Sequence, residues 1–383
     1  MPWVMVVTDD TAAINAAISS GGRCAPGTCA SSTLTPAIVY FPAGTYLVSS
    51  PIIDYYYTQI IGNPNCMPTI KASAGFSGAW VIDGDQYQAG GVLGFGSTNV
   101  FWRQIRNLVI DITAVPISNP LVCIHWLTAQ ATSLQNIVFK MSSAEGTQHE
   151  GVFIESGSGG LMTDLVFYGG NIGAFWGNQQ FTTRNLTFYN AVTAISQLWD
   201  WGWTYKGITI ENCKVGLNIS SLNNGAQAVG SVILIDSVIS NTEIGIATVR
   251  GPSSTPPTGA SMILENVVLN NVGTAIQGPN GALLGGGSFT IAGWGQGNTY
   301  TPNGPQTVQG TIPADNRPAS LLSGTSYYEQ SKPQYQSYST SSFVSVRTAG
   351  AKGDGITDDT VALRAIILAA AVSGSIVFFD AGT

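Results

Sequence analysis

Residues 106–110 read Arg106-Asn107-Leu108-Val109-Ile110, and this pattern recurs along much of the chain. The next two copies are Gln135-Asn136-Ile137-Val138-Phe139 and Thr163-Asp164-Leu165-Val166-Phe167. Aligned on the residue that follows the Asn, Asp or Gly, the anchor positions are Leu108, Ile137, Leu165, Leu186, Ile208, Val238 and Val267. Successive anchors are 29, 28, 21, 22, 30 and 29 residues apart, so the pattern has a period of structural size.

Each repeat is too short for a strand–helix–strand crossover, and it carries two or three short β-rich runs divided by Gly or Asn. Stacked coils of this length bury one another, which predicts an all-β, right-handed parallel β-helix. The Asn or Asp before each anchor suits a sharp bend between two sheets. A β-sandwich would also contain many short strands, but it would not explain one five-residue pattern that returns once per coil.

A second, much longer repeat links the two ends of the chain. Thr8-Asp9-Asp10-Thr11 opens an apolar helical pattern, and Thr357-Asp358-Asp359-Thr360 opens another. Each is followed by a strand-like run that closes in Ala-Gly-Thr, at Thr45 and at Thr383. We expect a short capping helix over 8–19, with Thr8 as its N-cap. The acidic pairs would then lie in a first helical turn, which favours capping over a catalytic carboxylate pair.

The long repeat predicts the start of two homologous domains. We assign 1–304 to a first β-helix domain, 305–342 to a linker rich in Pro, Ser, Gln and Tyr that lies over the helix surface, and 343–383 to the start of a second β-helix. Since the second copy has barely begun at Thr383, we expect this chain to be the first half of a longer protein.

The composition restricts the class of function. Of the 383 residues, 44% are hydrophobic and only 9% are charged, and Gly occurs 46 times. A net charge of −7 argues against a nucleic-acid partner, and no apolar run is long enough to span a membrane. We expect an extracellular protein that handles saccharides, with an export signal upstream of this chain. Cys24 and Cys29 flank a Pro-Gly turn, so a local disulfide is plausible. No Cys/His spacing predicts a metal site, and no cofactor is expected.

These features resemble glycoside hydrolase family 55, the exo-β-1,3-glucanases, and its pectate-lyase-like β-helix fold. Residues 350–360 resemble the opening of such a domain. Further stretches that carry the resemblance are Tyr40-Phe41-Pro42-Ala43-Gly44-Thr45-Tyr46, His125-Trp126, Gly146-Thr147-Gln148-His149-Glu150-Gly151, Glu155-Ser156-Gly157-Ser158-Gly159-Gly160 and Trp199-Asp200-Trp201-Gly202-Trp203. The family implies tandem β-helices, an inverting exo-acting site between them and a catalytic Glu from the second helix. That acid would lie beyond Thr383, so the fragment alone is expected to lack it.

Polar residues line up seven positions before successive anchors: Gln130, Ser158, Gln179 and Trp201. Inverting hydrolysis needs a general acid and a positioned water on the opposite face of the sugar. The resemblance implies that a Gln and a Ser of the first helix position this water, and Gln130 and Ser158 match best. The alternative is that these side chains form polar ladders without a catalytic role.

Aromatic residues cluster beside this column. We expect Trp199, Trp201 and Trp203 to share one face of an extended segment and, with Gln179, to bind the sugar. Trp176 and Tyr205 belong to the same aromatic cluster, which could instead cover one side of a coil.

The carboxylates and the histidine near these motifs also have structural interpretations that compete with a catalytic or binding role. Any of Glu150, Glu155 and Asp200 could contact sugar hydroxyls, and one could act as a base, although solvated surface charge is the simpler interpretation of all three. Of these we take Glu155 as the candidate sugar contact. His149 beside Glu150 could form a catalytic pair, although a structural histidine is the simpler interpretation.

The sequence therefore predicts β-1,3-glucan, or a related polysaccharide, and a second β-helix as partners. Two other classes stay open. A pectin-acting lyase would need calcium-binding Asp clusters and a basic residue, and a polygalacturonase would need clustered Asp with Gly-His-Gly; neither pattern is found. The other class is non-catalytic, either a structural β-helix or a saccharide-binding module. The Gln/Ser/Trp column favours saccharide contact but does not separate binding from hydrolysis.

Overall fold

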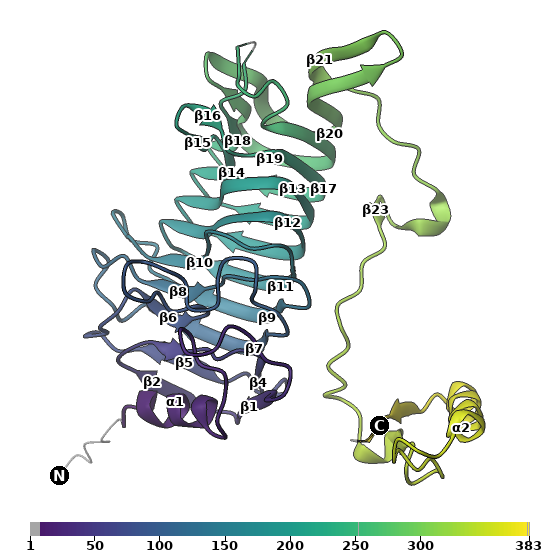
Figure 1. Ribbon diagram of the computed structural model, residues 1–383. Coiled ribbons are helices and arrows are strands. Elements are labelled where there is room, and N and C mark those ends of the chain that lie inside the picture. Colours follow the sequence, from purple (N-terminus) through teal and green to yellow (C-terminus); the bar gives the residue numbers. More distant parts are fainter. Residues whose placement is uncertain (1–7, 252, 381, 383) are drawn as a thin grey trace, which may run out of the picture. The chain divides into compact units, whose positions relative to one another are not determined.

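A computed structural model describes residues 8–251, 253–380 and 382 of the chain. The strands of the first unit stack coil upon coil into one long parallel β-helix, as Figure 1 shows. This confirms the predicted fold class. Residues 1–7 of the first predicted domain, and Ala381 and Thr383 at the end of the long repeat, lie outside the described residues.

Three faces build each coil. The first face contains β1 (Ala37–Phe41), β4 (Thr58–Gly62), β7 (Gln104–Asp111), β9 (Ser133–Lys140), β11 (Leu161–Tyr168), β17 (Ser231–Ser240) and parts of β12 (Ile172–Tyr189), β13 (Thr193–Glu211) and β19 (Ser261–Gly278). The second face begins with β2 (Thr45–Val48) and β5 (Thr69–Ala72) and continues in the carboxyl-terminal parts of β7 and the strands that follow it. The third face contains β3 (Ile52–Ile53), β6 (Trp80–Asp83), β8 (Val122–His125), β10 (Glu150–Ile154), β14 (Val215–Ile219), β18 (Ile244–Thr248) and the amino-terminal parts of β12 and β13.

A ladder of Asn and Asp residues makes the bend between the first two faces. These residues all have positive φ, between 50° and 60°, a conformation that Asn and Asp tolerate better than other side chains. The residues are Asn107, Asn136, Asp164, Asn185, Asp236 and Asn266. Neighbours in the ladder also bond to each other, as Asn136 Nδ2 does to Asn107 Oδ1 at 3.0 Å. The predicted role of the residue before each anchor is therefore confirmed.

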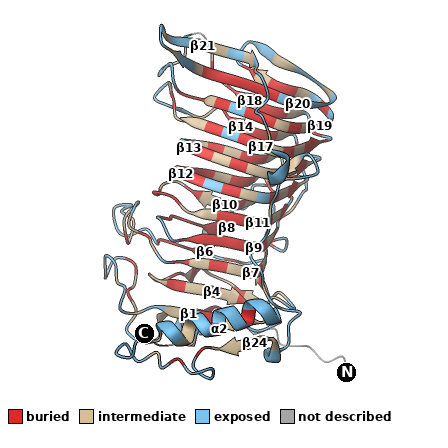
Figure 2. Ribbon diagram, turned by 90° about the vertical axis from the view of Figure 1, so that its right-hand side faces the viewer, coloured by how far each residue is buried: buried red, intermediate tan, exposed pale blue. Residues whose placement is uncertain are grey.

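The anchors themselves form a buried column. Leu108, Ile137, Leu165, Leu186 and Ile208 follow one another in register and are fully buried. Val238 was the wrong anchor, because Asp236 makes the bend and Ser237 pairs with Val267. Ser237 is tolerated at this buried position because its hydroxyl accepts a hydrogen bond from Ile208 N at 3.1 Å. Figure 2 shows how the buried positions repeat from coil to coil.

Two different devices close the ends of the helix. Helix α1 (Thr11–Ser19) buries Ile14 and Ile18 against the first coils, and its N-cap is Asp10 rather than the predicted Thr8. Asn15 ties α1 to the strands by donating to Pro51 O and accepting from Ile53 N. At the other end, β20 (Gly281–Thr301) pairs antiparallel with β19 of the last coil, and β21 (Gly304–Thr311) pairs antiparallel with β20. The strand β20 thereby covers the open edge of the last coil, which would otherwise present unpaired backbone groups.

The segment after β21 lies along the Asn/Asp ladder of the same unit. Arg317 bridges Asp236 and Glu265 at 2.6 Å each, and Glu329 pairs with Lys206 at 2.7 Å. The segment contains short elements: η1 (Ala319–Leu321), β22 (Leu322–Ser323) and β23 (Ser326–Tyr327). The first compact unit thus runs to Ser331, and the residue expected to end the domain, Gly304, begins β21.

The second compact unit spans Lys332–Thr383. It contains η2 (Thr340–Ser342), β24 (Phe343–Ser345), α2 (Thr360–Ser373) and β25 (Ile376–Phe378). β24 and β25 pair in parallel, and Val346, Ala351 and Ile366 form a small core. The helix-then-strand order matches α1 and β1, as the long repeat predicted.

The first unit also contains a disulfide and a short hairpin. The Cys24–Cys29 disulfide is formed. The hairpin β15 (Leu222–Asn223) and β16 (Ala226–Gln227) projects from one loop. None of the described helices is long and apolar enough to cross a membrane.

Candidate functional site

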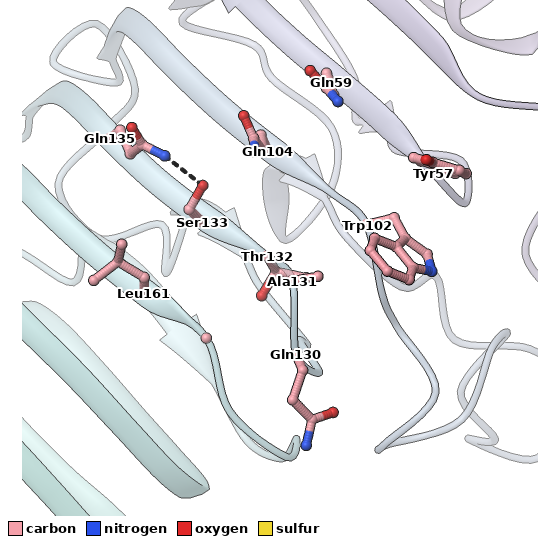
Figure 3. A pocket seen from close by; sticks show the side chains of 11 residues that line it. Tyr57, Gln59, Trp102, Gln104, Gln130, Ala131, Thr132, Ser133, Gln135 and Leu161 are labelled. Carbon is pink, nitrogen blue, oxygen red and sulfur yellow. Dashed lines mark hydrogen bonds between the residues drawn. The ribbon is translucent and has the colours of Figure 1, made fainter. Parts of the chain in front are cut away.

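Two adjoining pockets form one groove along the amino-terminal edge of the first face. Each has a volume of about 550–590 Å³, within the range of small-ligand sites. The first, shown in Figure 3, is lined by Tyr57, Gln59, Trp102, Gln104, Gln130, Ala131, Thr132, Ser133, Gln135, Gly160 and Leu161. The second is lined by Gln130, Ser158, Gly159, Gly160, Gln180, Phe181, Thr182, Trp201, Gly202, Trp203, Thr204, Ser231 and Ile233. Gln130 and Gly160 belong to both, so we treat the pockets as one groove.

The groove is uncharged. Amides, hydroxyls and aromatic rings line it, and no Asp, Glu, Lys or Arg is among its lining residues. Such a surface can donate and accept hydrogen bonds and offer apolar faces, but it provides no cation to neutralise an acidic polymer. Its chemistry suits a neutral saccharide.

Gln130 and Ser158 meet at the junction of the two pockets. The Ser158 hydroxyl donates to Gln130 Oε1 at 3.3 Å, so the structure brings these two predicted residues together. Gln130 is exposed, whereas Ser158 is 8% exposed. A hydroxyl and a primary amide side by side retain further donors and acceptors that can hold a water molecule.

Ser158 lies in a glycine-rich segment, residues 155–160, which we call the serine loop. A Cβ on Gly157 would lie 2.1 Å from Thr128 O, and one on Gly160 would lie 2.5 Å from the Phe181 ring. Both glycines also have φ near +150°. Only glycine allows the loop to run this close to the neighbouring coils.

Backbone and side-chain hydrogen bonds pin the serine loop. Ser158 N donates to Thr128 O at 3.0 Å, and Gly159 N donates to Asn178 Oδ1 at 2.7 Å. Asn178, which is fully buried, also donates to Thr128 O at 3.3 Å. The position of Ser158 is thereby set by two neighbouring coils.

The three tryptophans do not share a face, so that expectation is wrong. Trp201 is 67% exposed and lines the groove, whereas Trp203 is 1% exposed and stacks inside the helix on Phe181 at 4.8 Å between ring centroids. Trp199 is half-buried and donates from Nε1 to Glu155 O at 2.6 Å. Asp200 and Trp203 are both buried although they are three residues apart, so the regular alternation of a strand is broken within 200–203.

Several other candidate residues lie outside the groove lining. Gln180, one residue beyond the predicted Gln179, lines the groove. Trp176 and Tyr205 are buried core residues joined by a hydrogen bond of 2.7 Å, so they cover the inside of a coil. His149 is buried and contacts backbone atoms of Ser142 and Pro116.

The candidate carboxylates lie outside the groove lining. Burial raises the pKa of both Glu150 and Asp200 to about 7. Asp200 is buried and accepts from the backbone N–H groups of Gly230 and Ser231, so it is not the solvated surface charge that we predicted. The Glu155 carboxylate accepts hydrogen bonds from Tyr87 and from His125.

Sequence reasoning missed two features. The first is an aromatic pair at the end of the groove, Tyr57 and Trp102, whose rings lie 5.9 Å apart. The second is a line of three side chains, the buried Asp83 and His125 and the partly exposed Glu155. Asp83 pairs with His125 across neighbouring strands, and only the register between coils reveals such a contact. No group of three or more His, Cys, Asp or Glu among the described residues is arranged to hold a metal ion.

The amino-acid sequence matches the family described as rhamnogalacturonase A/epimerase, pectate lyase-like, over residues 6–218 and 343–383. The chain belongs to this family. Each matched segment contains one start of the long repeat, at Thr8 and at Thr357, and the β-helix of the structure agrees with the match.

Curated relatives of this pectate lyase-like chain include glucanases, as the resemblance to glycoside hydrolase family 55 implies. It is 47% identical to a glucan 1,3-β-glucosidase of Cochliobolus carbonum, over 98% of this chain and 48% of that protein. It is 41% identical to a probable glucan endo-1,3-β-glucosidase of Arthroderma benhamiae, over 98% of this chain and 54% of that protein. It is also 44% identical to the non-secreted LysM effector LysM19 of Penicillium expansum, over 98% of this chain and 30% of that protein. The chain spans about half the length, or less, of these relatives.

Proposed function

We propose that this chain supplies the first β-helix, and the water-positioning half of the site, of a β-1,3-glucan hydrolase. The uncharged groove with Gln130 and Ser158 at its centre carries the proposal. The glucanase names of two relatives support it. A pectin-acting enzyme is disfavoured because the groove provides no basic residue for a polygalacturonate chain.

The proposed reaction is exo-acting and inverting. Gln130 and Ser158 hold a water against the anomeric carbon, and Trp201 packs on a sugar face. Inversion also needs a carboxylic acid on the opposite side of the scissile bond. Since no carboxylate lines the groove, this acid comes from outside it, and the family resemblance assigns it to a second β-helix.

A saccharide-binding role without catalysis is the second candidate, and the absence of an acid from the groove lining favours it for residues 1–383 alone. We also propose an extracellular location for the parent protein. The Cys24–Cys29 disulfide supports it, because such bonds persist in oxidising compartments.

The binding test uses calorimetry of the 383-residue chain with laminarin, and polygalacturonate as the charged comparison. We expect binding to laminarin only, and weaker binding by Gln130→Ala. Gln148→Ala is the matched control, because Gln148 is an exposed glutamine outside the groove lining. Preference for polygalacturonate, or equal binding by both variants, would contradict the proposed substrate.

The catalytic test uses the longer protein that contains this chain. Ser158→Ala should lower kcat on laminarin about 100-fold, the scale of losing one positioned catalytic group, with little change in KM. Proton NMR of the first-formed glucose should show the α-anomer, as inversion of a β-linkage requires. Retention of the β-configuration would exclude the water-positioning role.

A further inference from the structure

His125 lies between two carboxylates on the third face of the helix. Its Nδ1 is 2.8 Å from Asp83 Oδ1, and its Nε2 is 2.9 Å from Glu155 Oε2. The ring is fully buried and stacks on Trp80 at 4.3 Å between centroids. The Glu155 side chain is 20% exposed and accepts a second hydrogen bond, from Tyr87. Asp83, His125 and Glu155 form what we call the histidine bridge.

Proton counting decides the charge of this bridge. A neutral imidazole has one N–H donor and one lone pair, whereas an imidazolium has two donors. With an ionised carboxylate at each nitrogen, the neutral ring would direct its lone pair at one of them. The imidazolium alone satisfies both contacts, and it is also the form that the two negative charges favour.

The surrounding charges agree with this assignment. Asp85, in the loop after β6, also lies near the ring, but burial raises its pKa to about 6, so Asp83 and Glu155 supply most of the negative charge there in mildly acidic solution. The buried Arg103 faces Asp83 and Asp85. Burial alone would lower the pKa of His125, but the hydrogen bonds and charges of Asp83 and Glu155 outweigh burial and raise that pKa above its ordinary value. Burial would likewise raise the pKa of Glu155, and the bonds from His125 and Tyr87 lower it instead.

The bridge ends where the serine loop begins. Glu155 is the first residue of that loop, three positions before Ser158. Its carboxylate is held by His125 and Tyr87, and its backbone oxygen accepts from Trp199 Nε1 at 2.6 Å. Asn178 holds the other end through Gly159 N. The serine loop is therefore fastened at both ends, with Ser158 between the two fastenings.

We propose that His125 is a positioning residue, which as an imidazolium fastens Glu155 and so holds the serine loop with Ser158 against Gln130. The inference rests on the proposed function for the catalytic meaning of that position. The fastening itself is a property of the loop and can be measured without substrate.

The sign of the pH dependence follows from the two groups. A raised histidine pKa gives a fastening that is complete below about pH 6.5 and is lost as the pH rises through the folded-state value. The lowered pKa of Glu155 gives a fastening that is complete above about pH 4.5. This fastening is lost as the pH falls through the folded-state pKa of Glu155. The serine loop should thus be held most firmly between these limits, in mildly acidic solution.

The first experiment is hydrogen–deuterium exchange of the intact chain at pH 6, followed by mass spectrometry of peptides covering 155–160. His125→Gln should speed exchange of this segment about tenfold, the effect of losing a charge-assisted hydrogen bond. Glu155→Gln, which keeps the side-chain shape, should do the same. His149→Gln is the control, because His149 is the other buried histidine and is bonded to backbone atoms rather than a carboxylate. Exchange unchanged in both bridge variants, or raised equally in the control, would overturn the proposal.

The second experiment is a pH series of laminarin affinity for the same proteins. The unmodified chain and His149→Gln should lose affinity as the pH rises through the folded-state pKa of His125, and His125→Gln should bind weakly at every pH. A His125→Gln profile that follows the unmodified chain would overturn the positioning role. If no protein binds laminarin at any pH, the proposed function fails, and the exchange result still decides whether the histidine bridge holds the loop.

Discussion

Trp201 and Trp203 are two residues apart, yet the structure predicts that replacing Trp203 lowers stability whereas replacing Trp201 weakens saccharide binding. Trp203 is 1% exposed, stacks on Trp176, Phe181 and Tyr205, and donates from Nε1 to Thr183 Oγ1 at 3.3 Å. Trp203→Ala removes an indole from a column that cannot collapse around the gap. A fully buried Trp→Ala change costs about 3–5 kcal/mol. We therefore expect the free energy of unfolding to fall by about 4 kcal/mol.

Trp201→Ala removes a side chain that is 67% exposed, so stability should stay within about 0.5 kcal/mol. Its effect should appear in binding instead. Covering one face of an exposed indole with an apolar sugar face is worth about 1–2 kcal/mol, so laminarin affinity should fall about tenfold.

Urea unfolding, followed by circular dichroism, measures the first quantity, and calorimetry with laminarin measures the second. Trp203→Ala serves as the stability reference for Trp201→Ala, because both remove one indole from β13. The reasoning is refuted if Trp201→Ala destabilises the fold as much as Trp203→Ala does. Unchanged affinity in Trp201→Ala would refute its place in the saccharide site.

Two further predictions concern charges outside the groove. Burial raises the pKa of Asp200 to about 7, so the unfolded chain releases this proton at lower pH than the folded chain. Stability should therefore fall between about pH 4 and pH 7, and Asp200→Asn should remove roughly 2–4 kcal/mol of that fall in unfolding curves at pH 5 and pH 8. Arg317→Ala should cost about 2–3 kcal/mol, because it leaves Asp236 and Glu265 without their common partner. Limited proteolysis should then cut 313–331 faster, while Arg364→Ala, an exposed arginine of the second unit, should leave the rate unchanged.

Local patterns were enough to predict the architecture. A coil of a β-helix contacts the coil before it and the coil after it, so the residues that specify its structure lie within about 30 positions of one another in the sequence. The Asn or Asp before each anchor tolerates positive φ, and this preference acts on a single residue. The pattern gave the wrong anchor at Val238, because the true anchor position holds the polar Ser237. The Ser237 hydroxyl can lie there because it accepts a hydrogen bond from Ile208 N.

The candidate site could be predicted only in part. Counting back from the anchors located Gln130 and Ser158, because the loops there are almost equal in length from coil to coil. The same count was one residue off at Gln179, and alternation failed for the tryptophans. Alternation is broken within 200–203, where Asp200 and Trp203 are both buried, and a shift of one residue moves a side chain to the other face.

The sequence by itself determined the coil, its period and the bend residues, because these depend on backbone preferences and on apolar spacing within one repeat. Only the tertiary structure decided that the groove is uncharged, that Trp203 lies inside while Trp201 faces the groove, and that His125 joins Asp83 to Glu155. Each of these depends on which residues of different coils stand opposite one another. That register is set by loop lengths and bulges, whose effect on side-chain direction appears once the coils are stacked.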